Sequence, residues 1–588
     1  MSSSNGGPRH AGPVLVITTM LVTLVSACSS TPVSVQGLPG PEQMARRLGS
    51  DVVGHLARGY VSGRSGEILL VPEPWNVLGN WTGGVRGVDD PRTTHATPWS
   101  YHQRVPLILY GPGFVRAGLR PERPVDVADL APTFAELMRF RFEAPDGRPL
   151  REALRPDLGK VPRAIVVVVY DGGGWNLLEQ WPDAWPVQRR LAEAGTMYVN
   201  ATVGSSPSLT APVHSTIGTG AYPRVHGIVE NTARMPDGSI GDVYGEDADP
   251  SLLEQPTLAD VWDRTNGDRP WVGMLGTEGW HLGMLGSGGS SAEQDVAVLW
   301  SHGRETFWTN EDRYRLPDYL PGPEVFRHRT LEIDGTDGAL DGRWRGNILS
   351  ADTYAYTGSP AFASYQGDAA IEILRREPIG EDRLTDLFFV EMKTTDVAGH
   401  VWNMLGPESE EVLRAQDRVL GALLKTLDEE IGRNRYVVAM TADHGQTPRP
   451  DVSGGLRVDR NAVLEDVNEA FGEVVEAVHP SDLFLDMDAV RAEGVSVEVI
   501  ARFLGDYRYG EGLPDGTDED AIPEAVLNRR VFAAAIPGSF IQGLTEGEIA
   551  ALGPGSYAES DLTTPPAIPS FAFRAAGGRE AARSEVTP

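Results

Sequence analysis

The chain has 588 residues, 41% of them hydrophobic, so it can bury one large α/β core with insertions or two domains. Its formal net charge at pH 7 is -31, and its three lysines are Lys160, Lys393 and Lys425. Such an excess of negative charge repels a nucleic-acid backbone unless a local basic patch overrides it. We therefore expect no bulk nucleic-acid binding, and we interpret the charge as a means of keeping an exported protein soluble.

The first residues have the pattern of an export signal. Arg9 precedes an apolar run over residues 14–24, which is too short to span a bilayer comfortably. The following Val-Ser-Ala-Cys28 is similar to a bacterial lipobox, and Cys28 is the only cysteine, so no intrachain disulfide can form. We predict a signal peptide over residues 1–27 and a lipid on Cys28, which places the protein on the outer face of the cell membrane. An ordinary secretory signal is the alternative.

Five short apolar runs are typical of buried strands, because each is rich in β-branched or aromatic residues and is followed by Gly, Pro or polar residues. They are residues 68–71, 106–110, 165–170, 387–390 and 436–440. Residues 409–425 repeat apolar side chains at helical spacing and predict a helix. Apolar strands that alternate with helices predict an α/β fold, a mostly parallel sheet sandwiched by helices.

Carboxylates, imidazoles and one hydroxyl gather near the ends of these strands, where ligands bind in parallel sheets. The set consists of Asp171, Thr210, Asp396, His400, Asp443 and His444. Each aspartate alone could be a helix N-cap, and each histidine could be an ordinary core or surface residue. Together they are typical of a two-metal hydrolase. Such mixed ligands suit zinc, with manganese and iron as alternatives.

The formal charges of this set also indicate hydrolysis. Three carboxylates against two divalent cations leave an excess of one positive charge, which attracts a phosphoryl anion. Metal coordination lowers the pKa of a hydroxyl enough to make Thr210 an alkoxide nucleophile. Two metals about 3.5 to 4 Å apart can stabilise the attacking and the leaving oxygen together.

The motifs around these residues resemble the alkaline phosphatase superfamily, most closely its type I phosphodiesterases and nucleotide pyrophosphatases. The resemblance is carried by Tyr170-Asp171-Gly172, Leu209-Thr210-Ala211-Pro212-Val213-His214, residues 219–231, Thr395-Asp396-Val397-Ala398-Gly399-His400 and Thr441-Ala442-Asp443-His444-Gly445. It covers about residues 55–545 and is patchy over residues 235–385.

That resemblance implies two zinc sites and a covalent phospho-threonine. The first zinc would be held by Asp171, Thr210, Asp443 and His444. The second would be held by Asp396, His400 and one further histidine. Thr210 would be the nucleophile, and Asn231 would hydrogen-bond a phosphoryl oxygen.

The family carries the further histidine well after the Asp-His pair, but here only His479 follows, without family-like surroundings. The expected segment lies near the N-terminus instead, around His95, followed by residues 105–113 and 127–133 in the family's C-terminal order. We infer a circular permutation in which His95 completes the second site, with His479 or His102 as alternatives. Since chain termini often lie close together, such a rearrangement preserves packing. It predicts that residues 531–543 lie close to residues 61–70.

The substrate class depends on how the site meets a second negative charge. Monoesterase relatives place a Lys and an Arg downstream of the nucleophile, whereas the comparable stretch here has Glu278 and His281. A glutamate there favours a diester monoanion over a monoester dianion. We therefore predict a phosphodiesterase or nucleotide pyrophosphatase acting on a small phosphate ester or nucleotide, with a phosphomonoesterase as the alternative. Trp280 and Trp175 are candidates for stacking on a base, or for packing alone.

Two other functions are alternatives. A sulfatase shares the fold but needs a Cys or Ser in a context that ends in arginine, and Ser205-Ser206-Pro207-Ser208-Leu209 lacks that arginine. The second alternative is a surface lipoprotein that binds metal but catalyses no reaction.

We expect one catalytic domain over residues 46–550. It comprises a permuted segment over residues 46–150, a core over 160–450 and a small inserted cap over 451–535, for which lateral decoration is the alternative. Residues 28–45 are expected to form a tether, and the Gly/Pro/Ala/Ser-rich residues 551–588 a disordered tail.

Overall fold

The apolar run that ends at Asp171 is the middle of a large sheet. A computed structural model describes residues 35–79, 93–156, 159–288, 295–301, 306–349, 354–513 and 517–557. Residues from Val35 onward form one unit, and the description concerns that unit. The predicted signal peptide and Cys28 lie outside the described residues. Among the helices described, none combines the length and the apolar character needed to cross a membrane.

The main sheet has eight strands in the order β12-β11-β10-β15-β5-β16-β3-β6. Their bounds are β12 (Thr306–Trp308), β11 (Val296–Ser301), β10 (Val272–Leu275), β15 (Asp386–Met392), β5 (Ala164–Tyr170), β16 (Tyr436–Ala442), β3 (Leu107–Tyr110) and β6 (Thr196–Tyr198). The strands from β11 to β16 run parallel, and antiparallel strands flank them at both edges. The predicted α/β fold with a mostly parallel sheet is confirmed.

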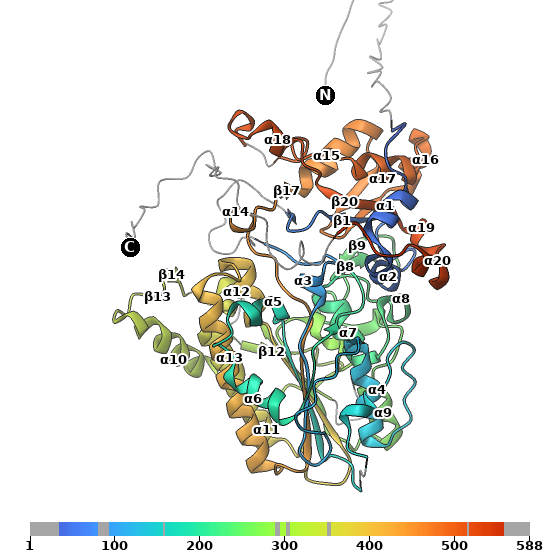
Figure 1. Cartoon of the computed structure of the whole chain (residues 1–588). Helices are drawn as coiled ribbons and strands as arrows, with labels where there is room; N and C mark the ends of the chain where they lie inside the picture. Colours follow the sequence, from blue (N-terminus) through green and yellow to red (C-terminus); the bar gives the residue numbers. More distant parts are fainter. Residues whose placement is uncertain are drawn as a thin grey trace, which may run out of the picture. The chain divides into compact units, whose positions relative to one another are not determined.

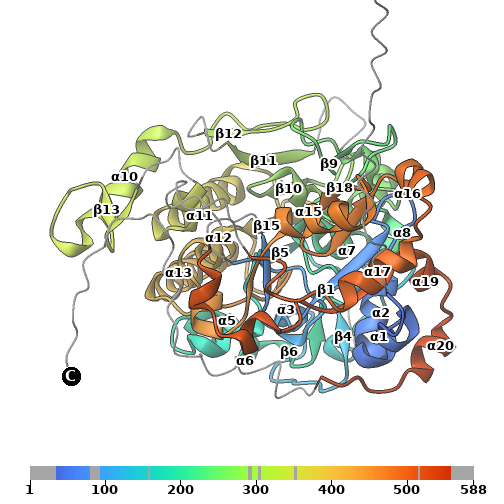
Figure 2. The same ribbon diagram turned by 90° about the horizontal axis from the view of Figure 1, so that it is seen from above.

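Helices cover both faces of this sheet, as Figures 1 and 2 show. On one face, Ile165 and Val167 of β5 join the apolar core of α4 (Leu130–Met138), α7 (Thr210–Thr219) and α9 (Leu258–Asn266). On the other face, Val166 and Val168 join the core of α11 (Pro360–Arg376) and α13 (Pro407–Glu430). Because alternate residues of β5 enter two different cores, its sequence is continuously apolar.

A second sheet of four strands has the order β18-β19-β1-β20. It consists of β18 (Val475–Val478), β19 (Asp482–Leu485), β1 (Ile68–Pro72) and β20 (Phe532–Pro537). The run 68–71, predicted as a strand, therefore belongs to this sheet and not to the main one. Strand β1 pairs antiparallel with β20, with Ile68 opposite Pro537 and Leu70 opposite Ala535. The predicted closeness of residues 531–543 to residues 61–70 is thus present, while the permutation itself stays a prediction.

The predicted cap shares this second sheet with the N-terminal part of the chain. Helices α15 (Arg460–Phe471), α16 (Met487–Glu493) and α17 (Val497–Gly505) accompany the sheet, together with α1 (Pro41–Leu48). Residues Ile68 and Leu70 of β1 enter one apolar core with Leu483 of β19 and Leu504 of α17. The layer is therefore built from both ends of the described chain.

Two expectations about the chain ends need correction. The tether predicted to extend to residue 45 ends earlier, because α1 begins at Pro41 and buries Met44. The tail predicted to be disordered from residue 551 is ordered up to Tyr557, whose ring packs on Trp99 and whose hydroxyl donates to Glu73 Oε2 at 3.0 Å. The contacts of Tyr557 order this part of the chain, although its Gly/Pro-rich composition is typical of disorder. Residues 558–588 lie outside the described part.

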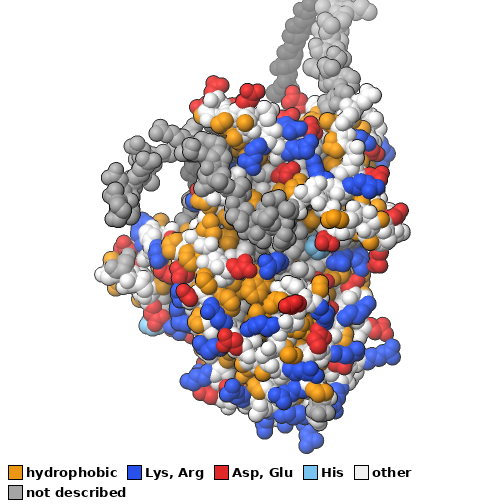
Figure 3. Space-filling view, in the orientation of Figure 1, with side chains coloured by type: hydrophobic (Ala, Val, Ile, Leu, Met, Phe, Trp, Pro, Cys, Tyr) orange, Lys and Arg blue, Asp and Glu red, His pale blue; other side chains and the backbone are white. Residues whose placement is uncertain are grey.

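Shorter elements connect these layers. The remaining helices are α2 (Ser50–Gly59), α3 (Ser100–Gln103), α5 (Trp175–Gln180), α6 (Pro186–Ala194), α8 (Pro223–His226), α10 (Pro323–Asp334), α12 (Thr394–Trp402), α14 (Pro450–Ser453), α18 (Glu524–Leu527), α19 (Gly538–Gln542) and α20 (Glu546–Ala551). The remaining strands are β2 (Val77–Gly79), β4 (Val125–Asp126), β7 (Ala201–Thr202), β8 (Thr232–Arg234), β9 (Ile240–Asp242), β13 (Arg343–Trp344), β14 (Asn347–Ile348) and β17 (Arg457–Asp459). On the face seen in Figure 3, acidic, basic and hydrophobic side chains are interspersed.

Candidate metal centre

Three aspartates reach one edge of the main sheet through the ends of adjacent strands. Tyr170 of β5 pairs with Ala442 of β16 on one side and with Met392 of β15 on the other. Asp171 and Asp443 directly follow β5 and β16, and Asp396 lies in the first turn of α12, which follows β15. All three side chains are buried. The register of the parallel strands thus brings together carboxylates that are far apart in the sequence.

His444 lies between two of these carboxylates. Its Nε2 atom is 3.3 Å from Asp171 Oδ1 and 3.3 Å from Asp443 Oδ2. Its Nδ1 atom is 3.0 Å from the carbonyl oxygen of Gly445. The ligand atoms of Asp171, Asp443 and His444 lie within 4.8 Å of one another, close enough to hold one metal ion. We call these residues the first group.

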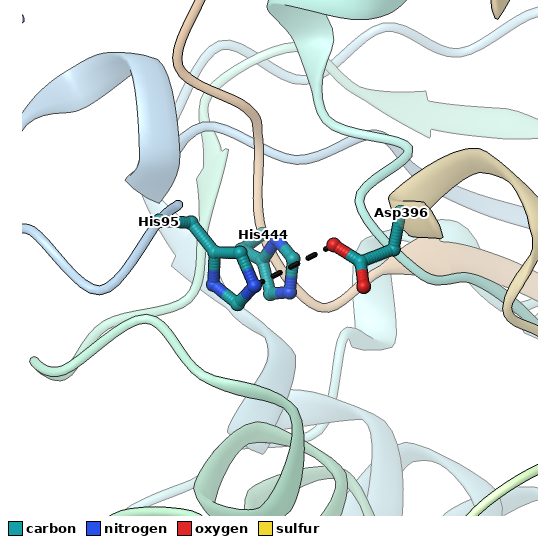
Figure 4. A group of neighbouring side chains, drawn as sticks. All are labelled: His95, Asp396 and His444. Carbon is teal, nitrogen blue, oxygen red and sulfur yellow. Dashed lines mark ion pairs between the residues drawn. The ribbon is translucent and has the colours of Figure 1, made fainter. Parts of the chain in front are cut away.

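His95 and His400 approach the third carboxylate. Their Nε2 atoms lie 3.5 Å and 3.2 Å from the same oxygen, Asp396 Oδ1. Figure 4 shows the side chains of His95 and Asp396 pointing toward each other beside His444. The rings of His95 and His444 stack with centroids 3.5 Å apart. The residues His95, His400 and Asp396 form the second group.

The histidines of the second group present a lone pair to Asp396. His95 Nδ1 lies 2.8 Å from the carbonyl oxygen of Ser208, and His400 Nδ1 lies 2.7 Å from that of Thr93. Because a carbonyl oxygen only accepts, each Nδ1 carries the hydrogen, and a ring that is neutral has its lone pair on Nε2. Asp396 outweighs burial and raises the pKa of His400. Burial, reinforced by His444, lowers the pKa of His95 well below its usual range. A lone pair facing a carboxylate oxygen is the arrangement that a cation between them would stabilise.

Neither alternative histidine reaches this group. His102 uses Nδ1 on the Thr97 hydroxyl and Nε2 on the Thr447 hydroxyl, both at 2.7 Å. His479 lies in the second layer, with Nδ1 3.0 Å from Glu230 Oε2. The structure therefore brings His95 to Asp396, although its role as a ligand stays a prediction.

The segment that carries His95 is anchored on both sides. Thr93 Oγ1 donates to the carbonyl oxygen of Thr447 at 2.7 Å, just after the Asp-His pair. Gln103 Nε2 donates to Ser208 Oγ at 2.6 Å, two residues before Thr210. These bonds hold residues 93–103 against the loops that carry the other candidate residues.

Thr210 is the first residue of α7 and is buried. The backbone amide of Ala211 donates to Asn231 Oδ1 at 2.9 Å, which fixes the Asn231 side chain beside the start of this helix. A helix N-terminus favours negative charge, because its amide groups lack partners within the helix and its dipole is positive there. The structure therefore places the predicted nucleophile and the predicted phosphoryl-binding residue together.

The residues of the first group fit a divalent cation, and the ligand atoms of His95, Asp396 and His444 also lie within 4.8 Å of one another. Asp171 Oδ1, Asp443 Oδ2 and His444 Nε2 are buried without a hydrogen-bond partner. Buried polar atoms left in this way are costly, and these three converge on one another. Burial and the charge of Asp171 raise the pKa of Asp443 to about 8. Carboxylate and imidazole ligands of this kind are those that zinc uses. The structure thus supports a metal centre without identifying the metal.

Two charged residues of the site were missed from the sequence. Lys393 Nζ lies 2.8 Å from Asp171 Oδ2 and 2.8 Å from Asp396 Oδ2. Glu391 is buried beside it, with Oε2 3.5 Å from His281 Nδ1 and 3.2 Å from the Thr277 hydroxyl. Lys393 precedes Asp396 by three residues in a chain with few lysines, and that spacing was the available signal.

The stretch predicted to contact substrate is divided between surface and core. His281 is fully buried, and its Nε2 lies 3.4 Å from Asp171 Oδ2. His281 thus contacts Asp171, and its predicted contact with substrate stays a prediction. The indole of Trp280 donates to Asp242 Oδ2 at 2.7 Å, and Glu278 is half-buried with its backbone amide donating to His281 Nδ1 at 2.9 Å. Trp280 and Glu278 stay candidates for substrate binding.

Comparison with known proteins identifies the family. Residues 165–519 match the family described as type I phosphodiesterase / nucleotide pyrophosphatase. The match spans more than half of the chain, so the protein belongs to this family. The predicted resemblance to this branch is confirmed.

Individual proteins that the chain resembles have low sequence identity to it. A protein of Myroides odoratus named calcium-transporting ATPase is 24% identical over 438 residues, 63% of this chain and 78% of that protein. Alkaline phosphatase PhoK of Sphingomonas sp is 26% identical over 334 residues, 49% of this chain and 56% of PhoK, so the match spans little more than half of that relative. The crystal structure of alkaline phosphatase PafA is 15% identical, with a TM-score of 0.48, over 64% of this chain and 84% of PafA.

Proposed function

We propose that the protein is a two-metal phosphoric ester hydrolase that acts through a covalent phospho-threonine at Thr210. The observation that carries this proposal is the convergence of the first group, the second group and the Thr210 hydroxyl at the N-terminus of α7. Membership of the phosphodiesterase family supports the reaction class. The proposed ligands are Asp171, Thr210, Asp443 and His444 for one metal, and Asp396, His400 and His95 for the other.

The chain's own residues define the reaction. When bound, two divalent cations would supply positive charge for the attacking and leaving oxygens and lower the pKa of the Thr210 hydroxyl. Thr210 releases its proton to solvent, its oxygen forms a bond to phosphorus, and the bond from phosphorus to the leaving oxygen breaks. Water then attacks phosphorus, loses a proton, and Thr210 departs and regains one. Asn231 is placed to donate its side-chain amide to a phosphoryl oxygen during both steps.

The ester class has two candidates. Glu278 favours a diester monoanion, as does the family description, and we keep a phosphodiesterase or nucleotide pyrophosphatase as the first candidate. Lys393 adds a positive charge beside Asp171 and Thr210, and this charge favours a phosphomonoesterase as the second candidate.

Turnover of a bis-aryl phosphate diester and of the corresponding monoester tests the proposal. We expect metal-loaded wild-type protein to hydrolyse at least one of them and Thr210→Ala to lose nearly all turnover, with two metal ions per chain by elemental analysis. Full turnover by Thr210→Ala would remove the covalent mechanism. Metal content without any turnover would identify a metal-binding surface protein instead.

We also propose that the protein is exported and anchored to the membrane by lipid on Cys28. The lipobox-like sequence supports this proposal, although Cys28 lies outside the described residues. Fractionation of cells that express wild type or Cys28→Ser tests it. We expect wild type in the membrane fraction and the variant in the soluble fraction, and equal distribution would contradict the anchor.

A further inference from the structure

Lys393 is a charged residue of the site for which the proposed ligand sets have no role. It follows β15 directly and precedes the first turn of α12, and its side chain is 3% exposed. The other lysines, by contrast, lie away from the site, and the Lys425 side chain is 76% exposed. Lys393 is therefore held at a fixed place, with its ammonium group between the carboxylates of the first and the second group.

The two carboxylates use different oxygens toward Lys393 and toward the imidazoles of the first and second groups, whereas His281 lies on the Lys393 side, 3.4 Å from Asp171 Oδ2. Lys393 Nζ contacts Asp171 Oδ2 and Asp396 Oδ2, each at 2.8 Å. The Oδ1 atoms face the imidazoles instead, with His444 Nε2 3.3 Å from Asp171 and His95 Nε2 3.5 Å from Asp396. The ammonium group thus leaves the imidazole-facing oxygens to the metals. Lys393 and two metal ions are compatible in one centre.

Lys393 also lies beside the atom that would attack phosphorus. Its Nζ atom is 3.4 Å from Thr210 Oγ1. A phosphoryl group that is joined to, or approaches, this oxygen comes within a few Å of the ammonium group. Coulomb attraction falls only with the inverse of distance, and it is strong in a buried site of low dielectric constant. The ammonium charge therefore acts on the phosphoryl group even without a direct hydrogen bond.

We propose that Lys393 is a further catalytic residue, whose fixed positive charge stabilises the Thr210 oxygen and the phosphoryl group and raises the affinity of the site for dianionic over monoanionic phosphoryl groups. This inference rests on the proposed nucleophilic role of Thr210. The effect is larger for a dianion because it carries one more negative charge than a diester monoanion. The relation holds whichever ester the wild type hydrolyses faster.

A purely structural role for Lys393 makes a different prediction. If the lysine only holds Asp171 and Asp396, its neutral variants lose metal or stability and affect both kinds of anion equally. Binding measurements on protein that cannot turn over distinguish these roles. They also separate this inference from the proposed function, because an inactive wild type would refute the latter and leave the binding result readable.

The experiment uses full-length, zinc-loaded protein that carries Thr210→Ala, combined with Lys393→Met, Lys393→Gln or Lys393→Arg. Lys425→Met is the matched control. Calorimetry measures the dissociation constants of inorganic phosphate at pH 8 and of dimethyl phosphate, and elemental analysis measures zinc. The ratio of kcat/KM for monoester to that for diester is measured with Thr210 intact.

We expect the neutral variants to keep two zinc ions and to bind phosphate about tenfold or more weakly, with a smaller change for dimethyl phosphate. Lys393→Arg should recover most of the phosphate affinity, and Lys425→Met should change neither. The ratio of kcat/KM should fall in the neutral variants. Unchanged phosphate affinity with both zinc ions present would overturn the proposal. Loss of zinc or of folding in both neutral variants would also overturn it, since it would assign Lys393 a structural role.

Discussion

His95 Nε2 and Asp396 Oδ1 lie 3.5 Å apart, although His95 belongs to an early loop and Asp396 to a helix late in the core. The contact depends on the anchoring of residues 93–103 by Thr447 and Ser208. It gives the second group a donor that no neighbouring strand of the main sheet provides. The predicted permutation would account for this contact between an early loop and the later part of the core, and it stays a prediction.

Removal of His95 should empty one of the two metal sites. We expect His95→Ala to hold about one metal ion per chain where wild type holds two, because Asp396 and His400 alone provide too few ligands. Elemental analysis after dialysis measures the content. His479→Ala is the matched control, since His479 contacts Glu230 in the second layer. Two ions in His95→Ala, or one in His479→Ala, would show that the assignment is wrong.

Removal of both metals should lower the thermal stability. Without cations, nothing offsets the cost of burying the polar atoms Asp171 Oδ1, Asp443 Oδ2 and His444 Nε2. We expect a chelator to lower the unfolding midpoint by about 3 °C or more, and added zinc to restore it. Differential scanning calorimetry measures the shift. An identical midpoint with and without the chelator would argue against a resident metal centre.

Replacement of Gly172 by alanine should displace neighbouring residues of the site. Gly172 has φ +66° and follows Asp171, and an added Cβ would lie 2.9 Å from the Cα atom of Asp396. We expect Gly172→Ala to lower kcat about tenfold or more, because the added methyl group would shift Asp396 and catalysis is sensitive to small displacements of such residues. Gly63→Ala is the matched control, since Gly63 also has positive φ, at +81°, but has open space around it.

The Gly63→Ala control should cost about 1 kcal/mol of unfolding free energy through backbone strain and leave kcat unchanged. Steady-state kinetics and denaturant unfolding separate the two effects. Equal kcat values for both variants would mean that the contact between Gly172 and Asp396 does not constrain the centre.

Asp482 should make stability depend on pH. Burial, with the charge of Glu230, raises the pKa of Asp482 to about 8, while a carboxyl group in an unfolded chain titrates near pH 4. Between about pH 4 and 8 the folded chain keeps a proton that the unfolded chain has lost, so stability falls as the pH rises. His479 faces the same cluster through Glu230, and this carboxylate outweighs burial and raises the pKa of His479.

Asp482→Asn removes that titration. The variant should be about 1 kcal/mol or more stable than wild type at pH 8, and close to wild type near pH 4. Urea unfolding at several pH values measures the difference. Asn can still accept the hydrogen bond from the Gly66 amide, which Asp482 Oδ1 accepts at 3.1 Å. A variant with the same pH dependence as wild type would contradict this account.

Local sequence patterns were sufficient for the strands β3, β5, β15 and β16 of the main sheet and for the aspartates, but not for β6, β10, β11 and β12. The runs at β5, β15 and β16 are apolar because both faces are buried, and an aspartate directly after such a strand must lie at the sheet edge. The run 68–71 carries the same pattern, yet it lies in the second sheet. Apolar periodicity identifies a strand but does not encode its partner.

Side-chain burial was harder to predict than residue position. His281 was predicted to bind substrate, and no sequence pattern indicated that its nitrogens also contact Asp171 and Glu391 in the interior. The burial of Lys393 is not predictable from its motif, because a lysine is usually exposed and only the convergence of Asp171 and Asp396 on it accounts for its position. Both cases depend on contacts between distant segments, which spacing within one motif cannot show.

Strand β1 lies between β19 and β20, so its two hydrogen-bonding neighbours are synthesised long after it. During synthesis the backbone groups of β1 lack these partners until residues 482–537 have been made. Such non-local pairing slows folding, and a prematurely terminated chain would present an open strand edge prone to aggregation. Completion of this layer is therefore a late step in the maturation of the molecule.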